Sequence, residues 1–471
     1  MKQEMEFKVI ELEYSKVLSK SKSGEIIALK EQRFLLINFP KLYEKEEKLF
    51  MKVLGELKES TKPINTKGEV YFFLKEYCLE NMILLNKEQR EKILCLLEWE
   101  TMEESILTPL LHDPELEEIV INGPKKPIMV YHSIFGWLTT NATFETEGKI
   151  RTLINKMAAP LGRQLSYNSP ILNAVLKDGS RLNASMSPIA FSGINATIRK
   201  FKENPLTPIS LVEYETISRE AIAFLWLAMQ TSCSILICGN TGSGKTTTLN
   251  ALFCFLPKEE RIVVAEETPE LTLPQNHTIK LNTAEQLNIT LGSLIDNTFR
   301  MRPDRVIVGE IRNTSEASAF VNTMLAGQAK GSYATFHAES ASEALQRLSS
   351  FGIEKQTLAS LDLIVVQKRL GIITNGARKE ERKVTQICEV IKDSENQEVK
   401  AKSIFEYSFE KKKLVKVYES SRVMEKICRT FSCKEREATK LIKEKEKLLG
   451  KLNKNISFKE FFQIAEQEQG E

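Results

Sequence analysis

One glycine-rich stretch constrains this chain more than any other part of its sequence. It matches the pattern G-x-x-x-x-G-K-[ST] at every fixed position and reads Gly239-Asn240-Thr241-Gly242-Ser243-Gly244-Lys245-Thr246. The apolar run 234–238 before it predicts a buried strand. Apolar residues at helical spacing follow from Leu249 until Pro257 stops the helix. A strand, a glycine loop and a helix in this order are the context in which the motif predicts phosphate binding.

The residue types in this loop suit a nucleoside triphosphate held together with Mg²⁺. The glycines let backbone N–H groups curl around phosphate oxygens, and the helix N-terminus adds a favourable dipole. We expect Lys245 to reach the β- and γ-phosphates and Thr246 to hold Mg²⁺ through its hydroxyl group. With Thr247, the predicted cofactor-binding set covers residues 239–247.

Composition limits the classes of protein to which the chain can belong. Its 471 residues are enough for two to four domains, and 42% hydrophobic with 27% charged residues is typical of a globular protein. A formal net charge of +3 gives no global attraction to nucleic acid. The eight cysteines contain no C-x-x-C pair, and neither they nor the four histidines have zinc-ligand spacing. We therefore expect reduced, mostly buried thiols in a cytoplasmic protein.

The sequence offers no segment that predicts insertion into a membrane. The first residues lack the apolar core of a signal peptide. The longest apolar run, residues 221–229, is far too short to span a bilayer. Any membrane role is therefore expected to work through a partner or through contact with the lipid surface.

The order of the predicted elements divides the chain into five parts. Residues 1–102 mix short strand-like runs with Lys/Glu-rich helical stretches, and a docking region, a spacer and a plain structural layer all remain open for them. Residues 103–203 predict an α+β domain, and the proline-stiffened stretch 204–208 predicts a linker. In residues 209–420 apolar strands alternate with helices, which predicts an α/β domain with a doubly wound parallel sheet and a small β extension. Residues 421–471 are charge-mixed and helical, which favours a solvated helical pair.

A carboxylate stands at the end of one predicted strand of this sheet. Glu310 follows the apolar run 306–308, and Gly309 occupies the position where many P-loop enzymes place a magnesium-binding Asp. The carboxyl end of such a strand is where a γ-phosphate and an attacking water would sit. We expect Glu310 to orient that water and to help hold Mg²⁺ through a shared water molecule.

Two further groups of polar residues follow predicted strands. Three acids, Glu266, Glu267 and Glu270, come at the end of the strand 262–265. Crowded anions repel a triphosphate unless a cation bridges them, so these acids indicate either a Mg²⁺-centred site or pairing with arginines. His337 ends the strand 333–336 and is expected to donate to the γ-phosphate or to relay its presence.

With these motifs in this order, the chain resembles the type II/type IV secretion ATPase superfamily over about residues 103–420. The run 301–312 is similar to that family's atypical Walker B region, and residues 178–181 and 198–200 resemble the arginine-bearing strands of its N-terminal domain. The resemblance is nearest to the archaeal motors for archaellum and type IV pilus assembly. In two departures from the pattern, Glu267 replaces the usual Asp and Gly327-Gln328 replaces the usual Gly-His.

The resemblance implies roles for individual residues. Glu310 would be the Walker B glutamate, and the three acids would form an acidic box. Arg181 and Arg199 would be arginine fingers, brought to the γ-phosphate when the domains close, and worth roughly 10³–10⁵ in rate. Four arginines near the Walker B strand would act across subunits or pair with the acidic box: Arg300, Arg302, Arg305 and Arg312. The implied catalytic set is Glu310, Glu266, Glu267, Glu270, His337, Arg181 and Arg199.

The resemblance also implies a RecA-like fold and a function. It predicts a cytoplasmic homo-hexameric ring, peripheral at the inner face of the cell membrane, that uses ATP and Mg²⁺ to work on a polytopic membrane platform protein. A RecA-like nucleic-acid-dependent ATPase is the alternative, but acids and bases are nearly balanced and no basic, aromatic stripe is visible, so no nucleic acid is expected. A third alternative, a structural ring gated by nucleotide without turnover, is disfavoured by intact Lys245, Thr246 and Glu310.

Overall fold

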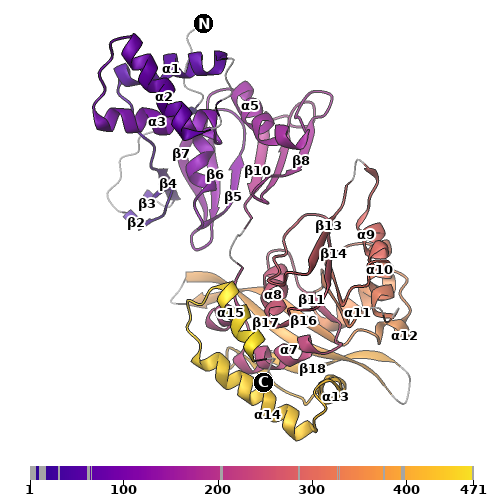
Figure 1. Cartoon of the computed structure of the whole chain (residues 1–471). Coiled ribbons are helices and arrows are strands. Elements are labelled where there is room, and N and C mark those ends of the chain that lie inside the picture. The colour runs from indigo at the N-terminus through magenta and orange to yellow at the C-terminus, as the bar shows by residue number, and fades with distance from the viewer. Residues whose placement is uncertain are drawn as a thin grey trace. The chain divides into compact units, whose positions relative to one another are not determined.

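The chain forms two compact units, Met1–Lys202 and Glu203–Glu471, each with its own sheet and apolar core (Figure 1). A computed structural model describes residues 7–9, 17–29, 32–60, 64, 66–201, 205–284, 287–325, 327, 329–374, 377–393 and 398–468. Both units mix helices and strands, so the predicted α/β class is confirmed at that level. Among the described residues, no helix is long and apolar enough to cross a bilayer. The predicted linker begins at a residue outside the description and ends at Pro208, the first residue of a helix.

A mainly antiparallel sheet forms the centre of the first unit. Its described strands pair in the order β2-β3-β4-β7-β6-β5-β10-β9-β8, with β1 also paired to β7. Their bounds are β1 (Phe7–Val9), β2 (Val17–Lys20), β3 (Gly24–Leu29), β4 (Gln32–Ile37), β5 (Leu116–Ile121), β6 (Pro127–His132), β7 (Gly136–Phe144), β8 (Ile171–Val175), β9 (Arg181–Ser185) and β10 (Asn195–Arg199). Strand β4 pairs in parallel with β7 through Phe34 and Thr139. The sheet thus crosses the predicted boundary at residue 103, and that domain division stays a prediction.

Helices cover this sheet and form a small core of their own. Their bounds are α1 (Glu44–Glu59), α2 (Lys67–Glu80), α3 (Lys87–Thr101), α4 (Thr108–Leu111) and α5 (Glu147–Ala158), with 3₁₀ turns at Ser105–Leu107 and Ala159–Leu161. Helix α3 begins where the side chain of Asn86 accepts the N–H of Gln89 and the side chain of Gln89 accepts the N–H of Asn86. Helices α1 to α3 bury apolar side chains against one another, whereas Ile150 and Ile154 of α5 join the core of the sheet.

A second sheet carries the glycine loop. Its described strands pair in the order β13-β12-β14-β15-β11-β16-β17-β18-β19, and the first six of these are parallel. Their bounds are β11 (Ile235–Cys238), β12 (Ile262–Glu266), β13 (Thr278–Asn282), β14 (Arg305–Ile311), β15 (Gly331–Phe336), β16 (Leu363–Thr374), β17 (Ala377–Lys392), β18 (Val399–Ser408) and β19 (Lys413–Lys416). The four strands predicted from apolar runs all lie in the parallel part. The last three strands form the antiparallel extension.

Both faces of this sheet are covered, because alternate residues of a strand point to opposite sides. In β11, Ile235 and Ile237 join one apolar core, and Leu236 and Cys238 join the other. Helices α9 (Leu291–Thr298), α10 (Thr314–Leu325), α11 (Ala341–Ser350) and α12 (Lys355–Leu358) cover one face. On the other face lie α6 (Pro208–Glu213), α7 (Arg219–Gln230), α8 (Lys245–Leu252) and a 3₁₀ turn at Phe253–Phe255.

The helices at the end of the described chain belong to that second core. They are α13 (Arg422–Thr430), α14 (Glu435–Lys451) and α15 (Phe458–Gln467), drawn in yellow in Figure 1. Helix α14 packs along α7, and Phe461 of α15 lies against Trp226 and Phe255. The expectation of a solvated helical pair is therefore wrong. The apolar faces of these helices complete the core, and most of the Lys and Glu residues that dominate the sequence lie on the outer faces.

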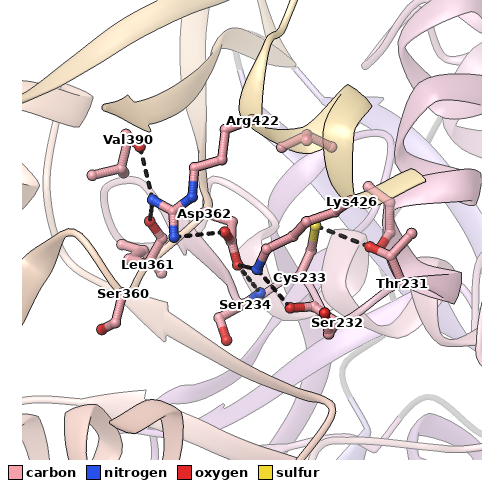
Figure 2. A network of polar contacts seen from close by, with 12 residues as sticks. Thr231, Ser232, Cys233, Ser234, Ser360, Leu361, Asp362, Val390, Arg422 and Lys426 are labelled. Atoms are coloured by element: carbon pink, nitrogen blue, oxygen red, sulfur yellow. Dashed lines mark hydrogen bonds and ion pairs between the residues drawn. The ribbon is translucent and has the colours of Figure 1, made fainter. Parts of the chain in front are cut away.

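A buried ion-pair network fastens α13 to the sheet (Figure 2). Asp362 is 1% exposed, and its carboxylate lies 2.9 Å from Nη2 of Arg422 and 2.8 Å from Nζ of Lys426. The same carboxylate accepts the N–H of Ser234 at 2.8 Å. One acid thus joins the amino ends of β11 and β16 to helix α13. Arg422 also donates to the carbonyl oxygens of Leu361 and Val390.

Candidate nucleotide-binding site

The glycine loop joins β11 to α8 as the sequence predicts, and α8 begins at Lys245. Gly242 and Gly244 have φ angles of 72° and 96°, in the left-handed region that favours glycine. A Cβ atom on Gly239 would stand 2.1 Å from the carbonyl oxygen of Gln367, so a larger residue would force the loop off the neighbouring strand. The hydroxyl oxygen of Ser243 is buried and has no hydrogen-bond partner among the described residues. These features fit a loop built to receive an oxygen-rich ligand.

Lys245 lies at the centre of the loop. Its Nζ donates to the carbonyl oxygens of Gly239 and Asn240 at 3.1 and 3.3 Å, and it lies 3.8 Å from Oε1 of Glu310. Burial lowers the pKa of Lys245, and the charge of Glu310 opposes that shift. A buried ammonium group held by weak carbonyl acceptors has a strong electrostatic reason to bind phosphate oxygens. Thr246 and Thr247 follow in the first turn of α8 and are half-buried.

Glu310 lies near the end of β14 and connects three groups of the site. Its Oε1 lies 2.8 Å from Nε2 of His337, and its Oε2 accepts Nε of Arg312 at 2.8 Å. Strand β15 lies between β14 and β11. His337, which follows β15, and Lys245 of the loop therefore both lie within reach of Glu310. The structure thus brings together Lys245, Glu310 and His337, which the sequence places far apart.

His337 follows β15 and is about one-third exposed. Burial and the nearby charge of Lys245 lower its pKa, whereas Glu310 raises it. The lowered pKa favours a neutral imidazole, and the 2.8 Å contact then requires Nε2–H to donate to the Glu310 carboxylate. Gln328, which stands where the family pattern usually has a histidine, lies outside the described residues.

The three predicted box acids occupy three different environments. Glu266 is buried, and its Oε1 accepts the N–H groups of Glu270 and Leu271 at 2.9 and 3.1 Å. Burial raises the pKa of Glu266 to about 7. Glu267 is half-exposed and forms an ion pair with Arg312. The charge of Glu270 acts on the Lys245 ammonium group and, like that of Glu310, opposes the lowering of the Lys245 pKa by burial.

Gly309 has a physical explanation in this arrangement. A Cβ atom at Gly309 would stand 3.1 Å from Cγ of Glu266, closer than most side chains allow. An Asp at this position, where many P-loop enzymes bind magnesium, would therefore have to displace the Glu266 side chain of the neighbouring strand β12. Among the described residues, no group of three or more His, Cys, Asp or Glu could hold a metal ion. The residues present fit Mg²⁺ shared with phosphate oxygens, since Mg²⁺ keeps few protein ligands in such sites.

The predicted arginines separate into different places. Arg312 pairs with Glu267 and Glu310, as expected for an arginine that meets the acidic box. Arg305 is fully buried at the start of β14 and bonds Glu260 at 2.6 Å, so it supports the fold. Arg181 and Arg199 stand directly opposite each other on β9 and β10. They belong to the first unit, and their role as fingers stays a prediction.

Residues on the β16–β17 hairpin also contact the loop, and the sequence analysis did not identify them. Oε1 of Gln367 accepts the hydroxyl of Thr248 at 2.7 Å, and Nε of Arg382 donates to the carbonyl oxygen of Gly242 at 3.0 Å. The sequence does contain a pattern that could have identified them. Gln367 and Arg369 follow the apolar run 363–366, just as polar residues follow the apolar runs of the other parallel strands.

Comparison with known proteins decides the family. Residues 100–459 match the model of the family described as type II/IV secretion system protein. The chain belongs to this family. The matched residues include the glycine loop, the strand that carries Glu310 and the β16–β17 hairpin. The resemblance expected from the sequence is therefore confirmed.

Single known proteins are similar to the chain over different parts of its length. An uncharacterized protein of Methanocaldococcus jannaschii is 34% identical over 357 residues, which are 74% of this chain and 63% of that protein. The chain thus spans under two thirds of that relative's length. The type IV secretion system protein VirB11 of Bartonella henselae is 27% identical over 281 residues, covering 52% of this chain and 78% of that protein. The crystal structure of the VirB11 ATPase of Brucella suis matches with 23% identity and a TM-score of 0.31, over 60% of this chain and 92% of that one.

Proposed function

We propose that this secretion-family member hydrolyses ATP and works as a ring-shaped motor at the inner face of the cell membrane. The observation that carries the proposal is the convergence of Lys245, Glu310 and His337 on one glycine loop. This arrangement supplies a phosphate-binding cation, a carboxylate for the attacking water and a donor that fixes the carboxylate. Family membership supports the same reaction.

Each residue has a distinct task in the proposed reaction. The loop N–H groups and Lys245 bind the β- and γ-phosphates of ATP. Glu310 orients and polarises the attacking water, and His337 holds the carboxylate through its Nε2–H group. Mg²⁺, when bound, neutralises phosphate charge, and Thr246 together with Glu310 through water would hold it. Glu266 is a poorer candidate for the water, because its Oε1 is already engaged by two backbone N–H groups.

The larger assembly is part of the proposal. We assign the second unit to the RecA-like class, because its loop strand lies inside a parallel sheet covered on both faces. A homo-hexamer would let Arg181 and Arg199 complete a nucleotide site. Its domain movements would act on a polytopic membrane platform protein, with contact to the lipid surface. A pilus-like or archaellum-like filament is the proposed product. The match of bacterial type IV secretion proteins supports a secretion role in general.

One experiment separates this function from its rivals. ATP turnover of the full chain is measured alone, with polar lipids and with single-stranded DNA. We expect basal turnover, stimulation by lipids and no response to DNA. Lys245→Ala should abolish turnover, and Lys447→Ala, on the exposed face of α14, is the matched control that should retain it. Stimulation by DNA alone would favour a nucleic-acid motor, and no turnover under any condition would contradict the proposal.

A further inference from the structure

The β16–β17 hairpin places two arginines against the glycine loop. Arg369 and Arg382 are directly opposite each other in the antiparallel pairing. Nε of Arg382 donates to the carbonyl oxygen of Gly242 at 3.0 Å. Nη1 of Arg369 lies 3.6 Å from the position of a Cβ on Gly242, and Cδ of Arg382 lies 3.5 Å from the corresponding position on Gly244. Both side chains therefore border the loop at Gly242, and Arg382 also borders Gly244.

This cross-strand pair is unfavourable without an anion. Like charges directly opposite each other destabilise a sheet. Glu380 compensates one of them, because its Oε2 accepts Nε of Arg369 at 2.7 Å. Arg382 bonds a carbonyl oxygen, and no carboxylate among the described residues pairs with it. One guanidinium charge thus remains uncompensated beside the loop, and both side chains are exposed to incoming ligands.

On the other face of the hairpin, the charged side chains are paired differently. Lys368 and Lys383 are also opposite each other, and their side chains point away from Arg369 and Arg382 because neighbours along a strand alternate. Lys383 is buried and pairs with Glu215 and Glu381 at 3.3 and 2.9 Å. Lys383 on that face thus pairs with two carboxylates, whereas Arg382 on the loop face pairs with none among the described residues.

We propose that Arg369 and Arg382 form a second anion-binding wall of the nucleotide site and bind the polyphosphate of the nucleotide held by the same subunit. A guanidinium group presents two parallel donors that match phosphate oxygens. Glu380 holds Arg369 in the absence of nucleotide and yields it to the phosphate on binding. The inference rests on the proposed function, because it names further binding residues of that site.

Equilibrium binding of a fluorescent ATP analogue to the full chain with Mg²⁺ tests the wall. We expect Arg369→Gln and Arg382→Gln each to weaken affinity about tenfold, as for loss of a charge-assisted contact. Arg382→Lys should fall between Gln and wild type. Glu380→Gln should strengthen binding by a few-fold, since it releases Arg369. The matched control Lys368→Gln removes the same charge from the opposite face and should bind as wild type does.

The salt dependence of binding separates a phosphate contact from a support that only shapes the loop. With phosphate contacts, each Gln variant should show a shallower loss of affinity with added KCl than wild type does. Wild-type affinity in both Gln variants would overturn the wall, as would a loss of binding in Glu380→Gln equal to that in Arg382→Gln. Absence of binding to the wild-type chain would instead overturn the proposed function.

Discussion

Glu266 is a buried carboxyl group that supports the site from behind. It holds the turn to Leu271 through two N–H groups and fills the space beside Gly309. Its low exposure raises its pKa to about 7, so near neutral pH the folded protein keeps it partly protonated. A carboxyl group in this state is suited to packing between two strands more than to polarising a water.

The raised pKa of Glu266 makes stability depend on pH. Below the pKa of the unfolded chain, near 4.5, the Glu266 carboxyl group is protonated in both the folded and the unfolded state, so its titration does not change the stability. As pH rises from about 4.5 to about 7, the unfolded chain loses this proton while the folded chain keeps it, so stability falls over this range and then stays level. Glu266→Gln keeps the shape and the acceptor and removes this loss. We expect it to stabilise the second unit by about 3 kcal/mol at pH 8 and by little at pH 4.

Urea unfolding of the chain without nucleotide or Mg²⁺, at pH 4 to 8, measures this effect. The control is Glu259→Gln, an exposed acid before the same strand, which should follow the wild-type curve within about 0.5 kcal/mol. A Glu266→Gln curve parallel to wild type at every pH would contradict the buried, pKa-shifted assignment.

At the scale of elements, the parallel strands were predictable because each is a short, fully apolar run. The run 235–238 matches β11 and the run 262–265 lies within β12, because burial on both faces leaves no polar position in such strands. The last helices were misjudged for the opposite reason. In α14, Ala438, Ile442 and Leu449 form a buried helical stripe, but Lys and Glu fill the positions between them and hide it.

The ion pairs of Asp362 are expected to carry much of the attachment of α13. Asp362→Asn keeps the size of the side chain and an acceptor for Ser234, but leaves Arg422 and Lys426 without a counter-charge. Breaking a buried pair costs about 3–5 kcal/mol. Water reaches both cations, so we expect about 3 kcal/mol, read as a lower urea midpoint for unfolding.

Glu425→Gln on the same helix is the matched control. Its exposed pair with Arg429 is a surface contact, and the loss should be at most about 0.5 kcal/mol. Equal destabilisation by Asp362→Asn and Glu425→Gln would show that the buried network contributes no more than a surface pair.

At the scale of the whole molecule, what the sequence predicts depends on how local each feature is. The loop and its flanking strand and helix lie within about twenty residues, so their pattern reveals the site directly. The contact of Arg382 with Gly242 joins positions 140 residues apart, and only the strand order brings them together. Lys245, Glu310 and His337 lie close together because parallel strands end at one edge of the sheet, and their roles in the reaction stay a prediction.

The ring is a prediction for the assembled protein. Arg181 and Arg199 are neighbours across two strands, and in a ring we expect both of them to reach a nucleotide site. We expect the mass in solution to approach six subunits with Mg²⁺ and a non-hydrolysable ATP analogue, measured by light scattering. A strict monomer at every protein concentration would count against the ring.

The central claim is that Glu310 activates water for hydrolysis of a nucleotide that the loop binds. Glu310→Gln is nearly isosteric, so the contacts of Lys245 and the loop should survive and Mg·ATP should still bind within a few-fold of wild-type affinity. Loss of the carboxylate charge should slow turnover by about 10²–10⁴-fold. Both quantities are measured on the same preparation of the full chain, by equilibrium binding and phosphate release. Near-wild-type turnover in Glu310→Gln, with an inactive Glu266→Gln or Glu270→Gln, would contradict the account.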